Sequence, residues 1–160
     1  MKGSQSLLFR YIISAFDHSG TWVTPYRSSG YQTLQLDIKR GEDIRSIQRH
    51  QLPERAHGIL LAPPCTDFSL SGAQYWKSKD SSGSTLDSLA LVDAGLRLVA
   101  LLDPHWWVLE NPTGRLQNYL GKPRMWFDPW EFAGWADDPD SERYTKRTGL
   151  WGRFNPDLPR

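Results

Sequence analysis

The chain has 160 residues and a formal net charge of +1, which suits one globular domain with a single core. Near-neutral charge excludes a polyanion-binding surface spread over the whole molecule, so nucleic-acid binding would need a local basic patch. The single cysteine excludes an internal disulfide framework, and no apolar run reaches membrane-spanning length. We therefore expect residues 1–160 to form one soluble cytoplasmic domain.

The amino-terminal pattern predicts a strand, a turn and a helix. Residues 1–6 are a polar tail, residues 7–16 form an apolar run typical of a strand, and a helix is expected over residues 22–29. Gly20 lies in the turn between them, where backbone must approach a ligand closely and helix-terminal N–H groups can receive a carboxylate. Many α/β turns contain one glycine, so this motif alone has low specificity.

Two acidic residues follow a second predicted strand. Residues 31–36 alternate in polarity and end at Asp37. An acid about twenty residues after a glycine turn is the residue that hydrogen-bonds ribose in nucleotide-binding α/β domains. Asp43 is a further candidate for ligand binding, but it equally fits the N-cap of a short helix that begins at Ile44.

The only cysteine lies just past a predicted buried strand, residues 58–62. Two prolines, Pro63 and Pro64, fix the backbone before Cys65, so its thiol is held on a stiff loop at the strand's carboxyl end. Ligands bind at such ends in open α/β sheets. A catalytic nucleophile and a small buried apolar side chain are the two interpretations of Cys65.

The middle of the chain predicts a loop, a helix and another strand. Residues 72–84 are rich in Ser, Gly and Lys and predict a mobile surface loop, whereas residues 85–102 have helical apolar spacing. The strand at residues 105–109 leads into Glu110, before Pro112 ends the ladder and Thr113 caps a helix. Glu110 is either a functional carboxylate or a capping or solvated one.

The alternation of strands and helices predicts an α/β fold with a mostly parallel sheet and helices on both faces. Toward the carboxyl end we expect a short helix over residues 114–120, strand-like residues within 125–132, an acidic turn at 136–142 and a tail from residue 152. Lys146, Arg147 and Arg153 are close in sequence and predict a local basic patch or a solvated basic tail.

Two motifs resemble those of the DNA (cytosine-5) methyltransferase family: Pro-Pro-Cys-Thr-Asp-Phe-Ser at residues 63–69, and Glu-Asn-Pro at residues 110–112 after Trp-Trp-Val-Leu. Residues 145–152, Thr-Lys-Arg-Thr-Gly-Leu-Trp-Gly, resemble the short phage-type form that lacks a target-recognition domain. The resemblance runs from Asp17 to Trp151. The glycine turn is reduced to Ser19-Gly20, and residues 145–147 are the only stand-in for the family's Gln-x-Arg-x-Arg segment.

This resemblance implies a Rossmann-like S-adenosylmethionine-dependent methyltransferase acting on C5 of cytosine in DNA. Cys65 would add to C6 of the ring, and Glu110 would protonate or hydrogen-bond N3 and stabilise the charge so created. Asn111 and Arg147 complete the implied catalytic set. The implied cofactor-binding residues are Asp17, Ser19, Gly20, Thr21, Trp22, Asp37, Ile38, Asp43 and Pro63. The implied substrate-binding residues are Pro64, Pro112, Lys146 and Thr148.

The substrate stays open between duplex DNA, single-stranded DNA and a free pyrimidine deoxynucleotide. A protein partner that supplies target recognition is a further expectation, as is the cytoplasm of a bacterial host cell, with no membrane or metal ion involved. A rival interpretation is a catalytically idle protein that holds nucleic acid or nucleotide in the same cleft. Binding of S-adenosylmethionine separates the two, since the idle protein would not bind it.

Overall fold

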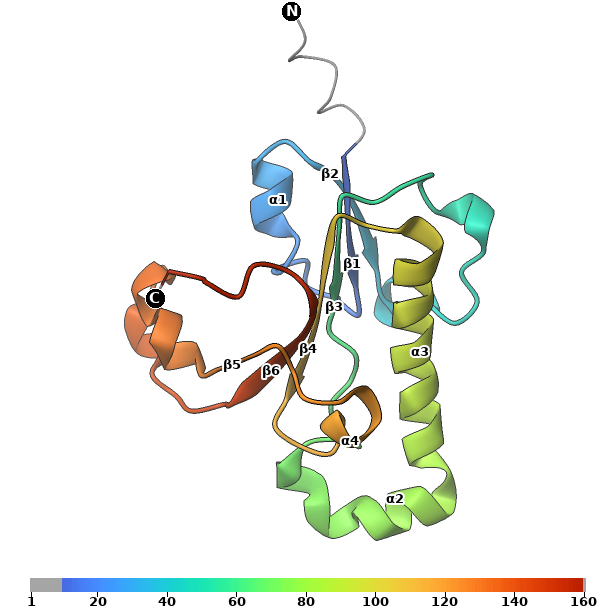
Figure 1. Ribbon diagram of the computed structural model, residues 1–160, viewed down its shortest axis with the longest axis vertical. Coiled ribbons are helices and arrows are strands. Elements are labelled where there is room, and N and C mark those ends of the chain that lie inside the picture. The colour runs from blue at the N-terminus through green and yellow to red at the C-terminus, as the bar shows by residue number, and fades with distance from the viewer. Residues whose placement is uncertain (1–9, 160) are drawn as a thin grey trace, which may run out of the picture.

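A six-stranded sheet runs through the centre of the computed structural model, which describes residues 10–159 (Figure 1). The strands lie in the order β2-β1-β3-β4-β6-β5. Their bounds are Tyr11–Ala15 (β1), Gln32–Leu36 (β2), Gly58–Leu61 (β3), Trp106–Pro112 (β4), Met125–Phe127 (β5) and Thr148–Arg153 (β6).

The first four strands pair in parallel, and β6 pairs antiparallel with both β4 and β5. Because β2 and β3 lie on opposite sides of β1, the chain reverses its direction across the sheet at the β1/β3 boundary. In open α/β sheets the crevice outside the carboxyl ends of the strands at such a reversal is the ligand-binding place.

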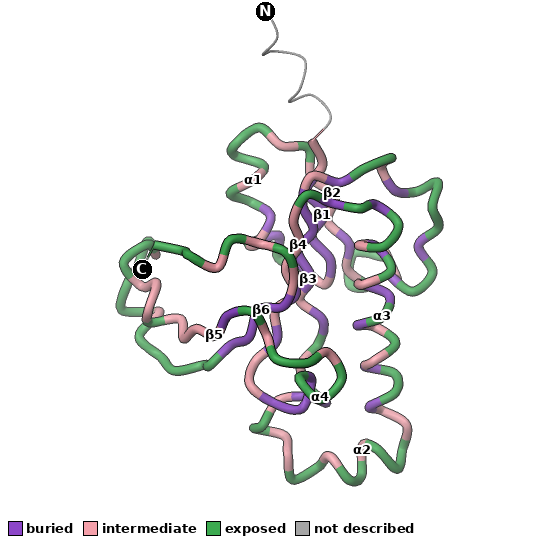
Figure 2. The backbone as a smooth tube through the Cα atoms, in the orientation of Figure 1, coloured by how far each residue is buried: buried purple, intermediate pink, exposed green. Residues whose placement is uncertain are grey.

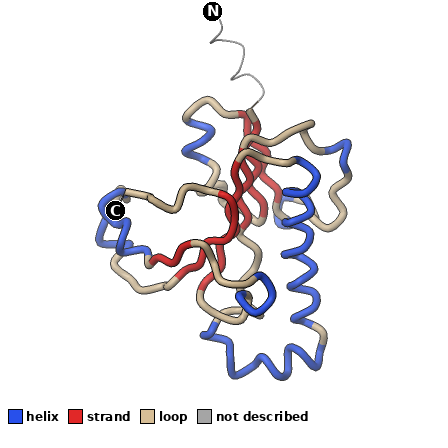
Figure 3. The backbone as a smooth tube through the Cα atoms, viewed as in Figure 1, coloured by secondary structure: helices blue, strands red, loops and turns tan. Residues whose placement is uncertain are grey.

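Helices lie on both faces of the sheet (Figures 1 and 3). The short α1 (Thr24–Ser28) lies on one face and the long α3 (Ser84–Leu102) on the other. The predicted α/β fold with a mostly parallel sheet is therefore confirmed. The remaining helical elements are α2 (Trp76–Ser82), α4 (Gln117–Leu120) and the 3₁₀ turns η1 (Ile38–Arg40), η2 (Arg49–Gln51), η3 (Leu70–Tyr75), η4 (Pro129–Trp135) and η5 (Pro139–Glu142).

Nearly all residues of β1 and β3 are buried, as Figure 2 shows by colour. Ile12 and Leu60 pack with Val23 in one cluster, and Ile13 and Ile59 belong to the larger cluster that includes buried residues of α3. Successive residues of a strand point to opposite faces, so an uninterrupted apolar run supplies both layers. This explains why the strands at residues 7–16 and 58–62 were predictable from apolar runs, although residues 7–9 lie outside the described part.

The long helix confirms the prediction for residues 85–102 almost residue for residue. It begins after Gly83, whose φ of +85° suits glycine, and it ends at Asp103 in the left-handed region (φ +38°), just before Pro104. Leu98 and Leu102 are buried on the inward face. The helix thus spans the sheet and connects β3 to its parallel neighbour β4.

The prediction of a mobile loop over residues 72–84 is wrong. These residues form the end of η3 and all of α2, with Gly83 separating α2 from α3. Lys79 and Asp80 of α2 form ion pairs with Asp67 and Arg115. Tertiary contacts from distant parts of the chain therefore outweigh a local composition that is typical of loops.

Three smaller predictions at strand and helix ends are also corrected. The strand predicted over residues 105–109 runs instead from Trp106 to Pro112, so Glu110 lies within β4, and the ladder ends at the pair of Pro112 with Thr148. Thr113 does not cap a helix: its Oγ1 donates to the carbonyl of Arg147 at 2.9 Å. The helix expected at Ile44 is only a turn, in which the Asp43 carboxylate accepts from the Arg45 N–H at 3.0 Å.

The basic cluster predicted near the carboxyl end is split by β6. Thr148 pairs with Pro112 at one end of β4 and Arg153 pairs with Trp107 at the other. Lys146 and Arg147 therefore lie at the edge of the sheet that carries Glu110, whereas Arg153 lies at the opposite edge. The expected tail from residue 152 also begins later, since β6 includes Arg153.

Within residues 10–159, no helix has the length and apolar character that crossing a bilayer requires.

Candidate active site

The cysteine loop and the Glu-Asn-Pro segment lie at the same edge of the sheet. Leu61 pairs with Leu109 in the parallel β3–β4 ladder, so the chain leaves β3 toward Cys65 beside Glu110–Pro112, which continue β4. A hydrogen bond joins them, since the fully buried Asn111 donates from Nδ2 to the Pro63 carbonyl at 3.0 Å. The two motifs are therefore neighbours in the structure, as predicted.

A second set of contacts joins the loops further out. The Leu70 N–H donates to the Thr113 carbonyl at 3.0 Å, and the Arg115 N–H donates to the Phe68 carbonyl at 2.8 Å. A Cβ on Gly114 would lie 1.8 Å from the Phe68 carbonyl oxygen. Only glycine permits this approach, so residue 114 is fixed by the contact with the cysteine loop.

Asp67, two residues after the cysteine, is fixed by three side-chain donors. Its carboxylate accepts from Ser84 Oγ at 2.8 Å and Ser88 Oγ at 2.6 Å, and it lies 2.9 Å from Lys79 Nζ. Burial alone would raise the pKa of Asp67, but the hydrogen bonds from Lys79, Ser88 and Ser84 lower it to about 2. An ionised Asp67 therefore ties the cysteine loop to α2 and α3.

Arg115 is the buried centre of the same network. Its Nε donates to the Asp67 carbonyl at 2.8 Å, its Nη1 to the Asp80 carboxylate at 2.8 Å and its Nη2 to Thr85 Oγ1 at 2.6 Å. The guanidinium also lies 4.9 Å from the centre of the Trp76 ring. No local motif marks Arg115, so sequence reasoning missed it.

Cys65 is a free, partly buried thiol at the start of a tight turn. Its carbonyl accepts from the N–H groups of Phe68 and Ser69, both at 2.9 Å. The residue before it, Pro64, lines a cavity described below. The sequence prediction that this thiol lies on a fixed loop past the end of β3 is confirmed.

Glu110 lines a cavity of about 960 Å³ at the same edge. Burial raises the pKa of Glu110, and the nearby charge of Lys146 opposes the rise. A partly buried carboxylate with a raised pKa carries a proton more readily than a solvated one, which suits a proton donor. Around Glu110 the cavity is lined by Ser19, Thr21, Trp22, Met125, Phe127, Pro129, Phe132, Tyr144, Lys146, Thr148, Leu150 and Leu158.

A second cavity, of about 530 Å³, brings together three of the predicted cofactor-binding residues: Asp37, Ile38 and Asp43. Asp37 Oδ1 accepts from the Lys39 N–H at 2.8 Å. Hydrogen bonds from Arg45, 2.7 Å away at the closest, lower the pKa of Asp43. The other lining residues include apolar side chains from several elements, namely Phe16, Leu36, Ile44, Ala62, Pro64 and Leu91.

The turn after β1 borders both cavities. His18 lines the one with Asp37, whereas Ser19, Thr21 and Trp22 line the one with Glu110. The buried Asp17 organises the turn by accepting from the Gly20 N–H at 2.8 Å and from Ser14 Oγ at 2.7 Å. Asp17 is one of the predicted cofactor-binding residues, and its carboxylate is thus hydrogen-bonded within the protein.

Gln35 of β2 and Phe16 at the end of β1 are two residues of this site that sequence reasoning missed. Gln35 Nε2 donates to the carbonyls of Asp17 and His18, and its side chain lies within 2.9 Å of where a Cβ of Gly20 would be. Phe16 has a φ of +63°, uncommon for a residue with a large side chain. The polar position in an alternating strand was the only available signal for Gln35.

Lys146, rather than Arg147, lines the Glu110 cavity. The Arg147 guanidinium lies 5.6 Å from the centre of the Trp126 ring, and its carbonyl accepts from the Thr113 N–H at 2.8 Å. The predicted substrate-binding Thr148 lines the cavity as well, and its strand partner Pro112 lies at the end of β4.

A mostly parallel sheet with an acid after β2 and paired cavities at the switch point defines a Rossmann-like α/β protein. Residues 23–124, more than half of the chain, match the C-5 cytosine-specific DNA methylase family, and the chain belongs to this family. The match contains Cys65 and Glu110, whereas the turn at Asp17 and the segment at Lys146 lie outside it. No curated protein matches the chain significantly. Members of the family use S-adenosylmethionine as methyl donor.

The part of the chain that the structure describes contains no group of three or more His, Cys, Asp or Glu side chains arranged to hold a metal ion.

Proposed function

We propose that this protein transfers a methyl group from S-adenosylmethionine to C5 of cytosine in DNA through a covalent adduct on Cys65. One observation carries the proposal. The loop with the partly buried thiol and the strand with the partly buried Glu110 are joined through the bond from Asn111 to the Pro63 carbonyl, in a chain of the cytosine C5-methylase family.

The chemistry needs a thiol and an acid on one ring. Cytosine C5 is weakly nucleophilic, so the Cys65 thiolate adds to C6, and the electron pair of the C5–C6 double bond becomes available at C5. Protonated Glu110 donates to N3 and stabilises the charge created by this addition, and its raised pKa supports the role. After C5 is methylated, its proton passes to a water molecule and the C–H electron pair re-forms the C5–C6 double bond. The S–C6 bond breaks with its electron pair on the Cys65 thiolate, and N3 returns its proton to Glu110.

The cavity with Asp37 fits the adenosine part of S-adenosylmethionine, which supplies an electrophilic methyl group when bound. Asp37 offers a carboxylate for ribose hydroxyls and Asp43 one for the adenine amino group, while Ile38, Phe16 and Pro64 offer apolar contacts for the base. We propose that Ser19, Gly20 and Thr21 receive the rest of the donor where the turn passes to the Glu110 cavity. Pro63 would support this cavity through its loop.

The Glu110 cavity would receive the cytosine. Aromatic side chains such as Phe127 and Phe132 can stack on a base, and Lys146 and Thr148 can contact its phosphate or its edge. Arg147 and Pro112 would shape the entrance from the ends of β6 and β4. We further propose a functional likeness to the short phage-type members, with single-stranded DNA as a substrate or with a protein partner that supplies target recognition.

Titration of the full chain with S-adenosylmethionine and with its demethylated product tests the proposal, together with transfer of a labelled methyl group to cytosine-containing DNA. We expect binding of both ligands, and Asp37→Ala should weaken it by at least about tenfold because a charge-assisted hydrogen bond is lost. Asp138→Ala, at an exposed acid that caps η5, is the matched control. Absence of binding would instead support a catalytically idle protein, and methylation of free deoxycytidine nucleotides alone would move the substrate to the nucleotide.

A further inference from the structure

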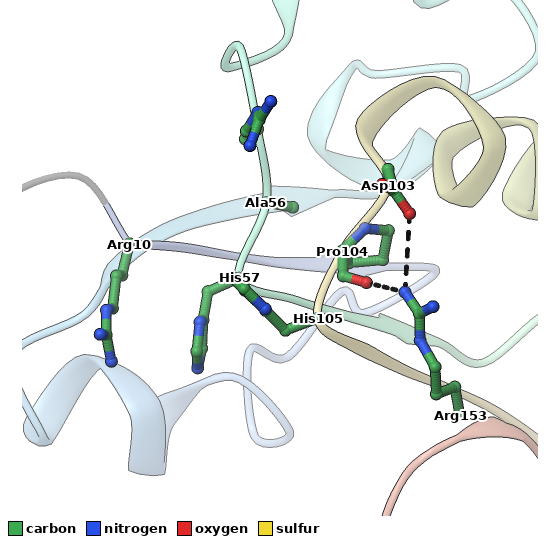
Figure 4. Close-up of a pocket in the computed structure, with 8 residues that line it drawn as sticks. Arg10, Ala56, His57, Asp103, Pro104, His105 and Arg153 are labelled. Atoms are coloured by element: carbon green, nitrogen blue, oxygen red, sulfur yellow. Dashed lines mark hydrogen bonds and ion pairs between the residues drawn. The ribbon is translucent and has the colours of Figure 1, made fainter.

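A third cavity, of about 450 Å³, lies at the opposite edge of the sheet from Cys65 and Glu110 (Figure 4). Its lining is dominated by cationic and titratable side chains, although the chain as a whole carries a net charge of only +1. The lining residues are Arg10, Arg55, Ala56, His57, Asp103, Pro104, His105 and Arg153.

The topology of the sheet explains why these residues meet. Arg10, His57 and His105 each stand immediately before a parallel strand, namely β1, β3 and β4. Arg153 ends β6, which runs in the opposite direction beside β4. Segments far apart in sequence therefore bring their basic residues to one edge, and no local motif in the chain marks the site.

The residues that line this cavity carry more positive than negative charge. Arg153 Nη2 lies 3.6 Å from Asp103 Oδ1 and donates to the Pro104 carbonyl, contacts drawn as dashed lines in Figure 4. Asp103 is the one carboxylate among the lining residues, against three arginines. The lining residues therefore have a formal charge of +2 before either histidine is protonated.

The two histidines lie next to each other in this cavity, and the pKa of His57 responds to the charges around it. Their ring centres lie 5.1 Å apart, and His57 also stacks on Tyr31 at 5.5 Å. Burial, followed by the charges of Arg10 and His105, lowers the pKa of His57. An anion in the cavity would offset these positive charges and would therefore favour the imidazolium form of His57.

We propose that this cavity, at the amino ends of β1, β3 and β4, is a phosphate-binding site. Arg55, Arg10 and the His57–His105 pair are its ligands. Guanidinium groups match phosphate oxygens in geometry and charge, and neutral or protonated imidazoles add N–H donors. The phosphate is carried either by a nucleic-acid strand or by a free phosphorylated molecule. The site lies away from the methyl-transfer centre, because the five residues from His105 to Glu110 span about 16 Å of strand.

The histidines provide a direct test in the full chain by NMR. Inorganic phosphate is titrated at constant pH while the imidazole C–H resonances of all four histidines are followed. We expect saturable shifts of His57 and His105 and a rise in the His57 titration midpoint, with His18 and His50 as internal controls because they lie outside this cavity. Shifts that are absent, do not saturate or are equal for all four histidines would overturn the proposal.

A variant pair and a second ligand complete the experiment. Arg55→Gln should weaken phosphate binding by about threefold or more, whereas Arg143→Gln, which removes an exposed arginine paired with Asp140 in η5, should not change it. Equal affinities for the two variants would contradict the assignment. A short single-stranded oligonucleotide that gives the same His57 and His105 shifts at a much lower concentration assigns the phosphate to nucleic acid, and equal potency assigns it to a free phosphorylated ligand.

Discussion

Two acidic side chains at the carboxyl edge of the sheet, Asp67 in the cysteine loop and Glu110 in β4, have opposite surroundings. Asp67 is held by Ser84, Ser88 and Lys79, which lower its pKa to about 2. Glu110 lines an open, largely apolar cavity, and its burial raises its pKa. The carboxylate of Asp67 is bonded within the protein, and Glu110 lines a cavity.

This difference separates structural from functional groups within one small area. A carboxylate with several internal donors contributes to stability, whereas a buried carboxylate kept short of donors costs stability and is retained where chemistry needs it. The region around Asp67 therefore braces the loop that carries Cys65, and we propose that the region around Glu110 holds the reacting ring. Substitutions in the two regions should affect different properties.

Glu110→Gln should have the largest effect. The amide cannot deliver a proton to N3, so we expect methyl transfer to fall by about 10²-fold to 10⁴-fold, the range typical of lost general acid catalysis. The thermal stability at pH 8 should be equal or higher, because an ionised carboxylate no longer has to be buried. Single-turnover methylation and thermal unfolding measure the two properties; unchanged activity would place the acid elsewhere.

Arg115→Ala should have the second-largest effect, which is a loss of folding stability. Removing the buried guanidinium leaves the Asp67 carbonyl and Thr85 without their donor, and we expect a loss of about 3 kcal/mol in the free energy of unfolding. Urea unfolding measures the loss, and Arg143→Ala at an exposed pair should change it by less than about 1 kcal/mol. Similar losses in the two variants would show that the network does not brace the loop.

The smallest expected effect is on the stability of the folded protein at acidic pH. The pKa of Asp67 is lower in the folded than in the unfolded protein, so its contribution is present above its unfolded pKa and is lost as pH falls from about 4 to about 2. Glu110 has the opposite sign: its contribution is present at low pH and is lost as pH rises through its raised pKa. Asp67→Asn should therefore flatten the acid limb of the stability curve. An unchanged limb would mean that other carboxylates control it.

The sequence predicted those parts of the fold that depend on local pattern. Apolar runs identified β1 and β3, and helical spacing identified α3, because these signals lie within one segment. Residues 72–84 were predicted as a loop because the contacts that make them helical come from Asp67 and Arg115, far away in the chain. Local composition does not encode such partners.

The same limit applies to the candidate site. The motifs around Cys65 and Glu110 were recognisable because each comes with a predictable strand: Cys65 follows β3, and Glu110 lies near the carboxyl end of β4. The division of the turn residues between two cavities, the role of Gln35 and the nearness of Lys146 to Glu110 depend on the pairing of strands. They could be found only in three dimensions.

The central claim is that Cys65 and Glu110 act on one cytosine ring, and covalent trapping tests it most directly. The full chain is incubated with S-adenosylmethionine and a 5-fluorocytosine oligonucleotide. Fluorine replaces the C5 proton, so the final elimination cannot occur, and the adduct is mapped by mass spectrometry. We predict one adduct, on the peptide that contains Cys65, which Cys65→Ser abolishes. An adduct on another residue, or one that Cys65→Ser retains, would contradict the claim.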